Sequence, residues 1–219
     1  IGGVRSVPRN VDVVVRDREA PPVEREDVYN VCYVNAFQTQ PNEKRFWKKR
    51  WDLVLKKKGR AVVDSGWGEW LLDIRTPAKR ERLAAIVGRW MSGCADAGYD
   101  AVEPDNLDSF LRSKGLIGTA DTAAFVRLLV QEAHGDGLAI AQKNRAGWDG
   151  SRLGMDFAVA EECAQYDECG SYQEHYGRQV LAVEYRAKSF ATACRRWEGE
   201  IALVRRDYAV SPQGVRRFC

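Results

Sequence analysis

The chain of 219 residues is long enough to form one large domain with its own core, and no linker or repeat divides it. Hydrophobic residues (45%) and charged residues (30%) occur in proportions that exclude a disordered chain. The net charge of +3 is close to neutral. The densest basic run, residues 48–60, interleaves with apolar residues, which predicts the solvated face of a helix and no nucleic-acid site. No apolar run is long enough to insert into a membrane.

Short apolar runs alternate with longer segments of helical period along the chain. The predicted strands are residues 11–17, 30–37, 69–75, 99–105, 137–144, 156–162, 179–185 and 200–207. The predicted helices are residues 77–98, 119–137 (with Thr119 as N-cap) and 188–199. The connection from 17 to 30 is short and holds Pro21 and Pro22, so the first helix is short or missing. Eight strand–helix units predict an α/β fold, a single compact (β/α)8 TIM barrel over 1–219. A doubly wound sheet is the alternative, but no glycine-rich phosphate turn follows an early strand.

Polar and mostly acidic side chains stand at the end of nearly every predicted strand. In a barrel these ends converge on one mouth, where the active site is built. The residues are Asp17, Asn35, Asp73, Glu103, Asp105, Lys143, Asn144, Glu161, Glu162, Glu184 and Asp207. The sequence therefore predicts an acidic pocket on a protein that is nearly neutral overall.

The six cysteines are even in number, contain no CxxC pair and are accompanied by only two histidines. This pattern favours three disulfides and an oxidising, extracellular location over a metal site. A short loop pairs Cys163 with Cys169, and a bond from Cys194 to Cys219 ties down the C-terminus. Cys32–Cys94 follows by elimination, with two buried thiols as the alternative.

Converging carboxylates without a metal motif or nucleotide loop fit glycoside hydrolysis, which needs one carboxylic acid and one carboxylate. Crowded carboxylates separate their pKa values, which separates these two roles. Aromatic side chains near the mouth would stack on sugar rings. The candidates are Tyr33, Phe37, Trp67, Trp70, Trp148, Tyr166 and Tyr185.

Six blocks then occur in a characteristic order: VCYVNAF, EWLLDIR, GYDAVEPDNLD, GLAIAQKN, DFAVAEECAQYDEC and VLAVEY. Over residues 30–185 they resemble glycoside hydrolase family 114, the endo-α-1,4-polygalactosaminidases. The resemblance implies that Asp105 is the nucleophile and Glu161 the acid/base, with Glu103 and Glu162 as the respective alternatives. Strand alternation puts Glu103 and Asp105 on one side, and Glu161 and Glu162 on opposite sides. Further substrate-binding residues implied by these blocks are Tyr33, Asp73, Glu103, Lys143, Asn144, Glu162, Tyr166, Glu184 and Tyr185. Lys143 has a second reading, as the charge partner of a mouth carboxylate.

The sequence departs from the family pattern at three places. Residues 37–40 replace a small turn that borders the sugar site, Gln142 stands where the family has Leu, and Ala160 where it often has Asn. The function expected from the resemblance is a secreted, retaining endo-glycosidase, a monomer without cofactor or metal, acting on cationic α-1,4-linked galactosamine-rich polysaccharide. The alternatives are a related glycosidase with another sugar specificity, or an inactive carbohydrate-binding barrel with a cleft reshaped by Phe37 and Gln38.

Overall fold

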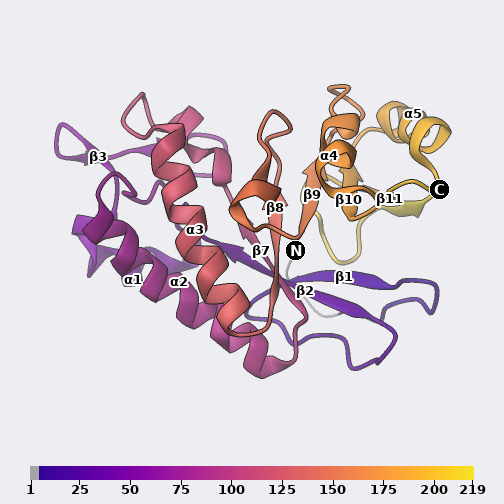
Figure 1. Ribbon diagram of the computed structural model, residues 1–219, viewed down its shortest axis with the longest axis horizontal. Coiled ribbons are helices and arrows are strands. Elements are labelled where there is room, and N and C mark those ends of the chain that lie inside the picture. The colour runs from indigo at the N-terminus through magenta and orange to yellow at the C-terminus, as the bar shows by residue number, and fades with distance from the viewer. Residues whose placement is uncertain (1–4) are drawn as a thin grey trace.

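The computed structural model describes residues 5–219, so residues 1–4 of the predicted domain lie outside it. Its centre is a curled sheet of eight strands (Figure 1), all parallel except the last. The order follows the chain: β1 (Val13–Asp17), β2 (Tyr29–Asn35), β7 (Ala101–Asp105), β8 (Ala139–Lys143), β9 (Phe157–Glu161), β10 (Val180–Glu184), β11 (Ala202–Arg206) and the antiparallel β12 (Arg216–Phe218). The predicted α/β fold of TIM-barrel type is confirmed, and within residues 5–219 the sheet forms a half-barrel.

The predicted third strand, 69–75, is the main difference from the expected barrel. Only β6 (Glu69–Trp70) forms there, paired with β5 (Val63–Asp64) outside the main sheet. The backbone of the following residues forms hydrogen bonds outside the main sheet. The Leu72 amide donates to the Phe37 carbonyl, and the Leu71 carbonyl accepts from the Leu55 amide. Strand β2 therefore pairs directly with β7.

The basic run 48–60 does not form the predicted helix. After α1 (Lys44–Lys48) and a 3-10 turn (Trp51–Leu53), the chain makes a hairpin of β3 (Lys56–Lys57) and β4 (Arg60–Ala61). The two residues between these strands, Lys58 and Gly59, both have positive φ angles, 51° and 77°. A two-residue turn of this kind fits the twist of a β-hairpin and interrupts helical periodicity.

The helices pack on the outer side of the curled sheet. They are α2 (Pro77–Ala97), α3 (Thr119–Gly135), α4 (Cys169–Tyr176) and α5 (Ala187–Trp197), with 3-10 turns at Pro41–Glu43, Leu107–Arg112 and Gly150–Leu153. Helices α2 and α3 lie side by side (Figure 1). Thr76 caps α2, and Gly98 ends it with φ 91°. Gly118, one residue before the predicted Thr119, is the N-cap of α3. No helix forms between β1 and β2, as predicted.

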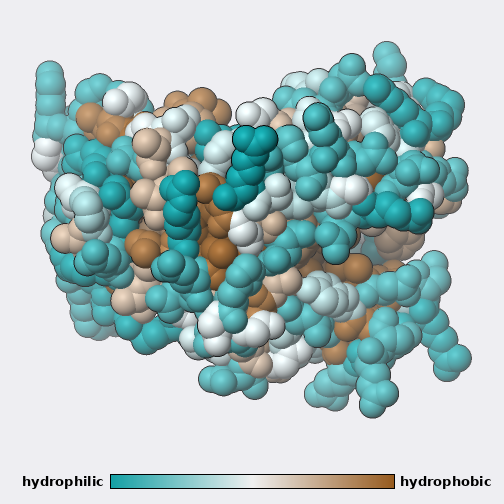
Figure 2. Space-filling model, in the orientation of Figure 1, coloured by the Kyte–Doolittle hydropathy of each residue, from teal (hydrophilic) through white to brown (hydrophobic). Residues whose placement is uncertain are grey.

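All three predicted disulfides are present: Cys32–Cys94, Cys163–Cys169 and Cys194–Cys219. The first ties β2 to α2, and the last ties α5 to the residue after β12. Within residues 5–219, no helix combines the length and apolarity that crossing a bilayer requires. The face in Figure 2 is largely hydrophilic, with hydrophobic residues visible chiefly in its recesses.

Candidate active site

A cavity of about 970 Å³ lies at the carboxyl ends of the parallel strands. Eight acidic side chains line it: Asp17, Asp64, Glu69, Asp105, Asp108, Glu161, Glu162 and Glu168. Three basic ones do so too: Arg112, Lys143 and Arg145. The parallel register brings the strand ends to one edge, which is why residues far apart in sequence meet here. Of the residues expected there from the strand ends, Asp17, Asp105, Lys143, Asn144, Glu161 and Glu162 line the cavity, whereas Asn35, Asp73, Glu103, Glu184 and Asp207 do not.

The centre of the pocket floor is the buried ammonium of Lys143, at the end of β8. Its Nζ lies 2.8 Å from Glu103 Oε1, 3.2 Å from Asp105 Oδ1 and 3.7 Å from Glu161 Oε2. Burial lowers the pKa of Lys143, but the carboxylates of Asp105, Glu103 and Glu161 outweigh burial and raise it well above its ordinary value. Lys143 is therefore charged and is the ion-pair partner of three carboxylates, and it also lines the cavity.

Asp105 is the member of the β7 carboxylate pair that faces the cavity. Its side chain is 18% exposed, whereas that of Glu103 is 2% exposed. Asp105 accepts hydrogen bonds from the Tyr33 hydroxyl (2.8 Å) and the Asn106 amide (2.7 Å). Burial raises its pKa, but Lys143 and these two donors lower it overall. Burial dominates at Glu103, whose pKa is raised. Asp105 is thus an accessible anion suited to act as a nucleophile.

Glu161 ends β9, with its Oε2 3.7 Å from Lys143 Nζ. Its carboxylate accepts hydrogen bonds from Asn144 Nδ2 (3.0 Å) and from the Tyr185 hydroxyl, and its amide donates to Asn144 Oδ1 at 2.8 Å. Burial and the neighbouring Glu161 raise the pKa of Tyr185, so its hydroxyl remains a proton donor. Glu162 also lines the cavity, because the chain leaves the strand there with φ 57°. The alternation argument therefore does not separate Glu161 from Glu162.

Their common partner limits how far apart Asp105 and Glu161 can be. Since Lys143 Nζ lies 3.2 Å from Asp105 Oδ1 and 3.7 Å from Glu161 Oε2, these oxygens are at most about 7 Å apart. Carboxyl groups are about 5–5.5 Å apart in retaining glycosidases and about 6.5–9.5 Å apart in inverting ones. The pair is close enough to act on the two sides of one glycosidic bond.

Gln142, one of the departures from the family pattern, organises the loop after β8. Its buried Nε2 donates to the carbonyls of Asn144, Arg145 and Trp148, and its Oε1 accepts from the Gly150 amide and the Tyr176 hydroxyl. The loop holds Asn144 at φ 53°, from where its amide reaches Glu161. A leucine could make none of these bonds.

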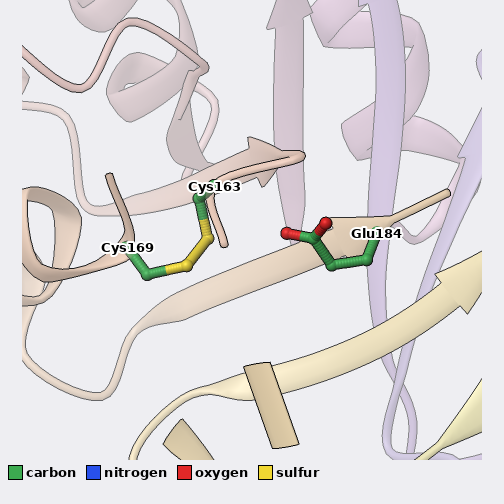
Figure 3. A group of neighbouring side chains, drawn as sticks. All are labelled: Cys163, Cys169 and Glu184. Carbon is green, nitrogen blue, oxygen red and sulfur yellow. A yellow bond between two sulfur atoms is a disulfide. The ribbon is translucent and has the colours of Figure 1, made fainter. Parts of the chain in front are cut away.

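Three of the predicted substrate-binding residues do not line the cavity. Glu103 is buried against Lys143, and Asp73 is buried and paired with Arg75 (2.7 Å) and Lys79 (2.5 Å). Glu184 lies beside the Cys163–Cys169 disulfide (Figure 3), where it accepts a hydrogen bond of 2.7 Å from the Ala164 amide. Glu103 and Asp73 are thus paired with cations of the protein, whereas Glu184 Oε2 is buried without a hydrogen-bond partner among the described residues. The other predicted residues line the cavity: Tyr33, Lys143, Asn144, Glu162, Tyr166 and Tyr185.

The structure places some of the predicted aromatic side chains at the cavity and others in the core. Of the seven candidates, Tyr33, Trp67, Tyr166 and Tyr185 line the cavity. Phe37 is 1% exposed and packs edge-on against Phe125, so it belongs to the core and does not reshape the cleft. Gln38 is fully buried as well, and only Gln40 of the altered turn reaches the cavity.

One side of the cavity is lined by polar residues from loops, most of which the sequence did not predict. Arg112 pairs with Asp64 (2.8 Å) and Asp108 (2.6 Å) and donates to Asn106 Oδ1. Asn106 then donates to Asn35, which donates to Glu69 at 2.9 Å. Asp64, Glu69 and Arg112 do not stand at the ends of main-sheet strands, so the pattern of strand ends could not reveal them. Asp108 is the exception, because the block GYDAVEPDNLD contains it.

We expect the stability of the protein to depend on pH through the partly buried carboxyl group of Glu69. Burial raises its pKa to about 7, against a smaller lowering by the Asn35 hydrogen bond. The folded state thus binds a proton at Glu69 more tightly than the unfolded state does, since the pKa of an unfolded glutamate is about 4.3. The stabilisation is present at acidic pH and is lost as pH rises through about 7. We expect Glu69→Gln to flatten this decline between about pH 5 and 8, measured by thermal unfolding. The exposed Glu24→Gln is the control, and an equal shift of both variants at all pH values would contradict the assignment.

A curled α/β sheet with carboxylates gathered at its C-terminal edge is an arrangement typical of glycoside hydrolases, and this chain is a glycoside hydrolase. More specifically, the chain belongs to glycoside hydrolase family GH114, whose family model matches residues 1–219. A solved structure of Aspergillus fumigatus Ega3 in complex with galactosamine is similar over 99% of this chain and 91% of its own, at 23% identity and TM-score 0.78. The glycoside hydrolase domain of PelA from Pseudomonas aeruginosa is similar over 98% and 95%, at 16% identity and TM-score 0.70. A search of curated proteins gives no significant match.

Proposed function

We propose that this glycoside hydrolase is a secreted endo-glycosidase that cleaves α-1,4-linked galactosamine-rich polysaccharide with retention of anomeric configuration. The observation that carries the proposal is the pair Asp105 and Glu161, which face one cavity across the charged Lys143. Asp105 is the nucleophile and Glu161 the acid/base. The likeness to a fold solved with galactosamine bound supports the choice of sugar.

The reaction takes two displacements at the anomeric carbon. Asp105 attacks that carbon while Glu161 gives its proton to the glycosidic oxygen, so the bond from carbon to leaving oxygen breaks and a glycosyl ester forms. Glu161, now ionised, removes a proton from water, whose oxygen attacks the same carbon and releases Asp105. Lys143 keeps Asp105 anionic, and Tyr33 orients it with a hydrogen bond. Asn144 and Tyr185 hold Glu161.

The pocket's charge supports a cationic substrate. Eight acidic against three basic side chains line it, although the whole protein carries +3. Carboxylates gathered in a cleft focus the field and raise the encounter rate of ammonium-bearing sugars. The substrate contacts we propose, besides the catalytic pair, are Tyr33, Lys143, Asn144, Glu162, Tyr166 and Tyr185.

Secretion is proposed on two grounds. All six cysteines form disulfides, which persist in oxidising environments and are rare in the cytosol. A polysaccharide substrate of this kind lies outside the cell, where an enzyme must be exported to reach it.

The test is digestion of partly deacetylated α-1,4-galactosamine polymer, followed by mass spectrometry and early proton NMR of the new reducing ends. We expect oligomers of mixed length whose first-formed anomer is α. Monomers alone would contradict an endo mode, and a β anomer would contradict retention. Binding of the polymer without any product would favour an inactive carbohydrate-binding protein.

A further inference from the structure

Two exposed aromatic rings meet at the rim of the cavity. Trp67 is 57% exposed and Tyr208 65% exposed, and both line the cavity. Their ring centroids are 5.9 Å apart and their planes differ by 7°, an offset-stacked arrangement. Trp67 lies in the loop between β5 and β6, and Tyr208 in the loop between β11 and β12. Segments far apart in the chain thus form one aromatic surface.

Trp67 differs from the other tryptophans in its ring partner, since one of its faces stacks on Tyr208. Over five of the seven tryptophans lies a Lys or Arg of the protein: Trp51, Trp70, Trp90, Trp148 and Trp197. Trp47 is fully buried and donates to Glu43. Within residues 5–219, no Lys or Arg covers Trp67, although it is the most exposed tryptophan. The indole face is the strongest cation binder among aromatic side chains.

Tyr208 connects this surface to the catalytic pair. Its ring packs against that of Tyr185 with centroids 5.2 Å apart at 62°, and the Tyr185 hydroxyl donates to Glu161. The aromatic surface is therefore on the Glu161 side of the cavity. Since Glu161 is the group that protonates the leaving oxygen, a sugar held here belongs to the leaving half of the chain.

The loop that carries Tyr208 is braced from both ends. The Arg206 side chain donates to the carbonyls of Ser211 (2.7 Å) and Val215 (2.9 Å). Asp207 accepts a hydrogen bond of 3.0 Å from the Ser211 amide. The Cys194–Cys219 disulfide fixes the end of β12 to α5. Tyr208 is thus exposed on an ordered support, as a binding residue needs to be.

We propose that Trp67 and Tyr208 form a leaving-side subsite that binds an unacetylated amino-sugar ring, with its ammonium over the indole face that does not stack on Tyr208. This inference rests on the proposed function and adds a selectivity to it. An acetamide has no charge, so an N-acetylated sugar at this position loses the cation–π attraction. Eight acidic side chains line the same cavity, against three basic ones, and favour the same cation.

The test measures binding of two oligomers of equal length, α-1,4-linked galactosamine and its fully N-acetylated form, by calorimetry. Asp105→Asn is the background, because it blocks turnover. We expect Trp67→Ala and Tyr208→Ala each to weaken binding of the unacetylated oligomer by roughly 2- to 30-fold, the range of a cation–π contact, and to change the acetylated one much less. Trp51→Ala is the matched control, an exposed tryptophan outside the cavity with Lys56 already over its ring.

The outcomes separate this subsite from the function on which it rests. Unchanged binding in both variants would overturn the subsite and leave the proposed function intact. Equally weakened binding of both oligomers would also overturn the subsite, since a purely structural or apolar role of these rings would not distinguish a charged sugar from an uncharged one. If the Asp105→Asn background bound neither oligomer, the proposed function and the subsite would both be contradicted. Trp67→Phe, a smaller ring, should fall between the parent and Trp67→Ala.

Discussion

We expect Asp105→Asn and Glu161→Gln each to lower the turnover of α-1,4-galactosamine polymer by about 10²–10⁴-fold or more, the range for loss of a catalytic acid/base. In the proposed mechanism, Asp105→Asn removes the anion that attacks, and Glu161→Gln removes the proton that the leaving oxygen needs. Both replacements keep the side chain's shape and part of its hydrogen bonding, so the fold should survive. The measurement is the initial rate of appearance of new reducing ends, with circular dichroism to confirm folding.

Variants of the two neighbouring carboxyl groups, Glu162 and Glu103, test the assignment further. Glu162→Gln should lose less activity than Glu161→Gln, because only Glu161 is held by Asn144, Tyr185 and Lys143. Glu103→Gln alters a group that is 2% exposed and cannot meet the substrate directly. If Glu103→Gln were inactive and Asp105→Asn active, the nucleophile would be misassigned.

Lys143→Met destabilises the protein by about 3–5 kcal/mol at neutral pH, the range for removing one partner of a buried ion pair. The methionine fills similar space but leaves Glu103 and Asp105 without their shared cation. The free energy of unfolding, measured with guanidinium, gives the loss directly. Adding Glu103→Gln to Lys143→Met removes one stranded carboxylate and should restore part of the stability.

The pH dependence of this loss identifies its cause. Because the pKa of Lys143 is raised on folding, its charged form stabilises the folded state fully below the unfolded pKa of about 10.4. This stabilisation is lost at higher pH, as the lysine of the folded protein loses its proton. The lowered pKa of Asp105 stabilises it above about pH 3.9 and is lost as pH falls. The difference between wild type and Lys143→Met should therefore be largest between these limits and shrink at acidic pH. A constant difference at all pH values would indicate lost packing instead.

The acidic floor of the cavity could be predicted from the sequence because it depends on local pattern. Strands such as 99–105 and 156–162 end in acidic residues, and parallel pairing brings those ends to one edge. The cysteine pairs followed from spacing and even number. The residue-level choice between Glu103 and Asp105 needed the structure, because alternation puts both on one side and only exposure separates them.

The features of the site that could not be predicted from the sequence depend on hydrogen bonds between residues far apart in the chain. Residues 69–75 have a strand's composition, yet antiparallel bridges to Gln38 and Val54 draw them out of the main sheet. That displacement brings Glu69 and Trp67 to the cavity rim. Tyr208 reaches the same rim from the far end of the chain, in the loop of the β11–β12 hairpin.

Trapping the glycosyl-enzyme intermediate tests the central claim most directly. Glu161→Gln, incubated with an α-galactosaminyl fluoride that needs no protonation to leave, should form the ester and hydrolyse it slowly without a base. Mass spectrometry of the intact protein and of its peptides should then show one galactosaminyl group on Asp105. An adduct on Glu103, or fluoride release without any adduct, would contradict the assignment of Asp105 as nucleophile and Glu161 as acid/base.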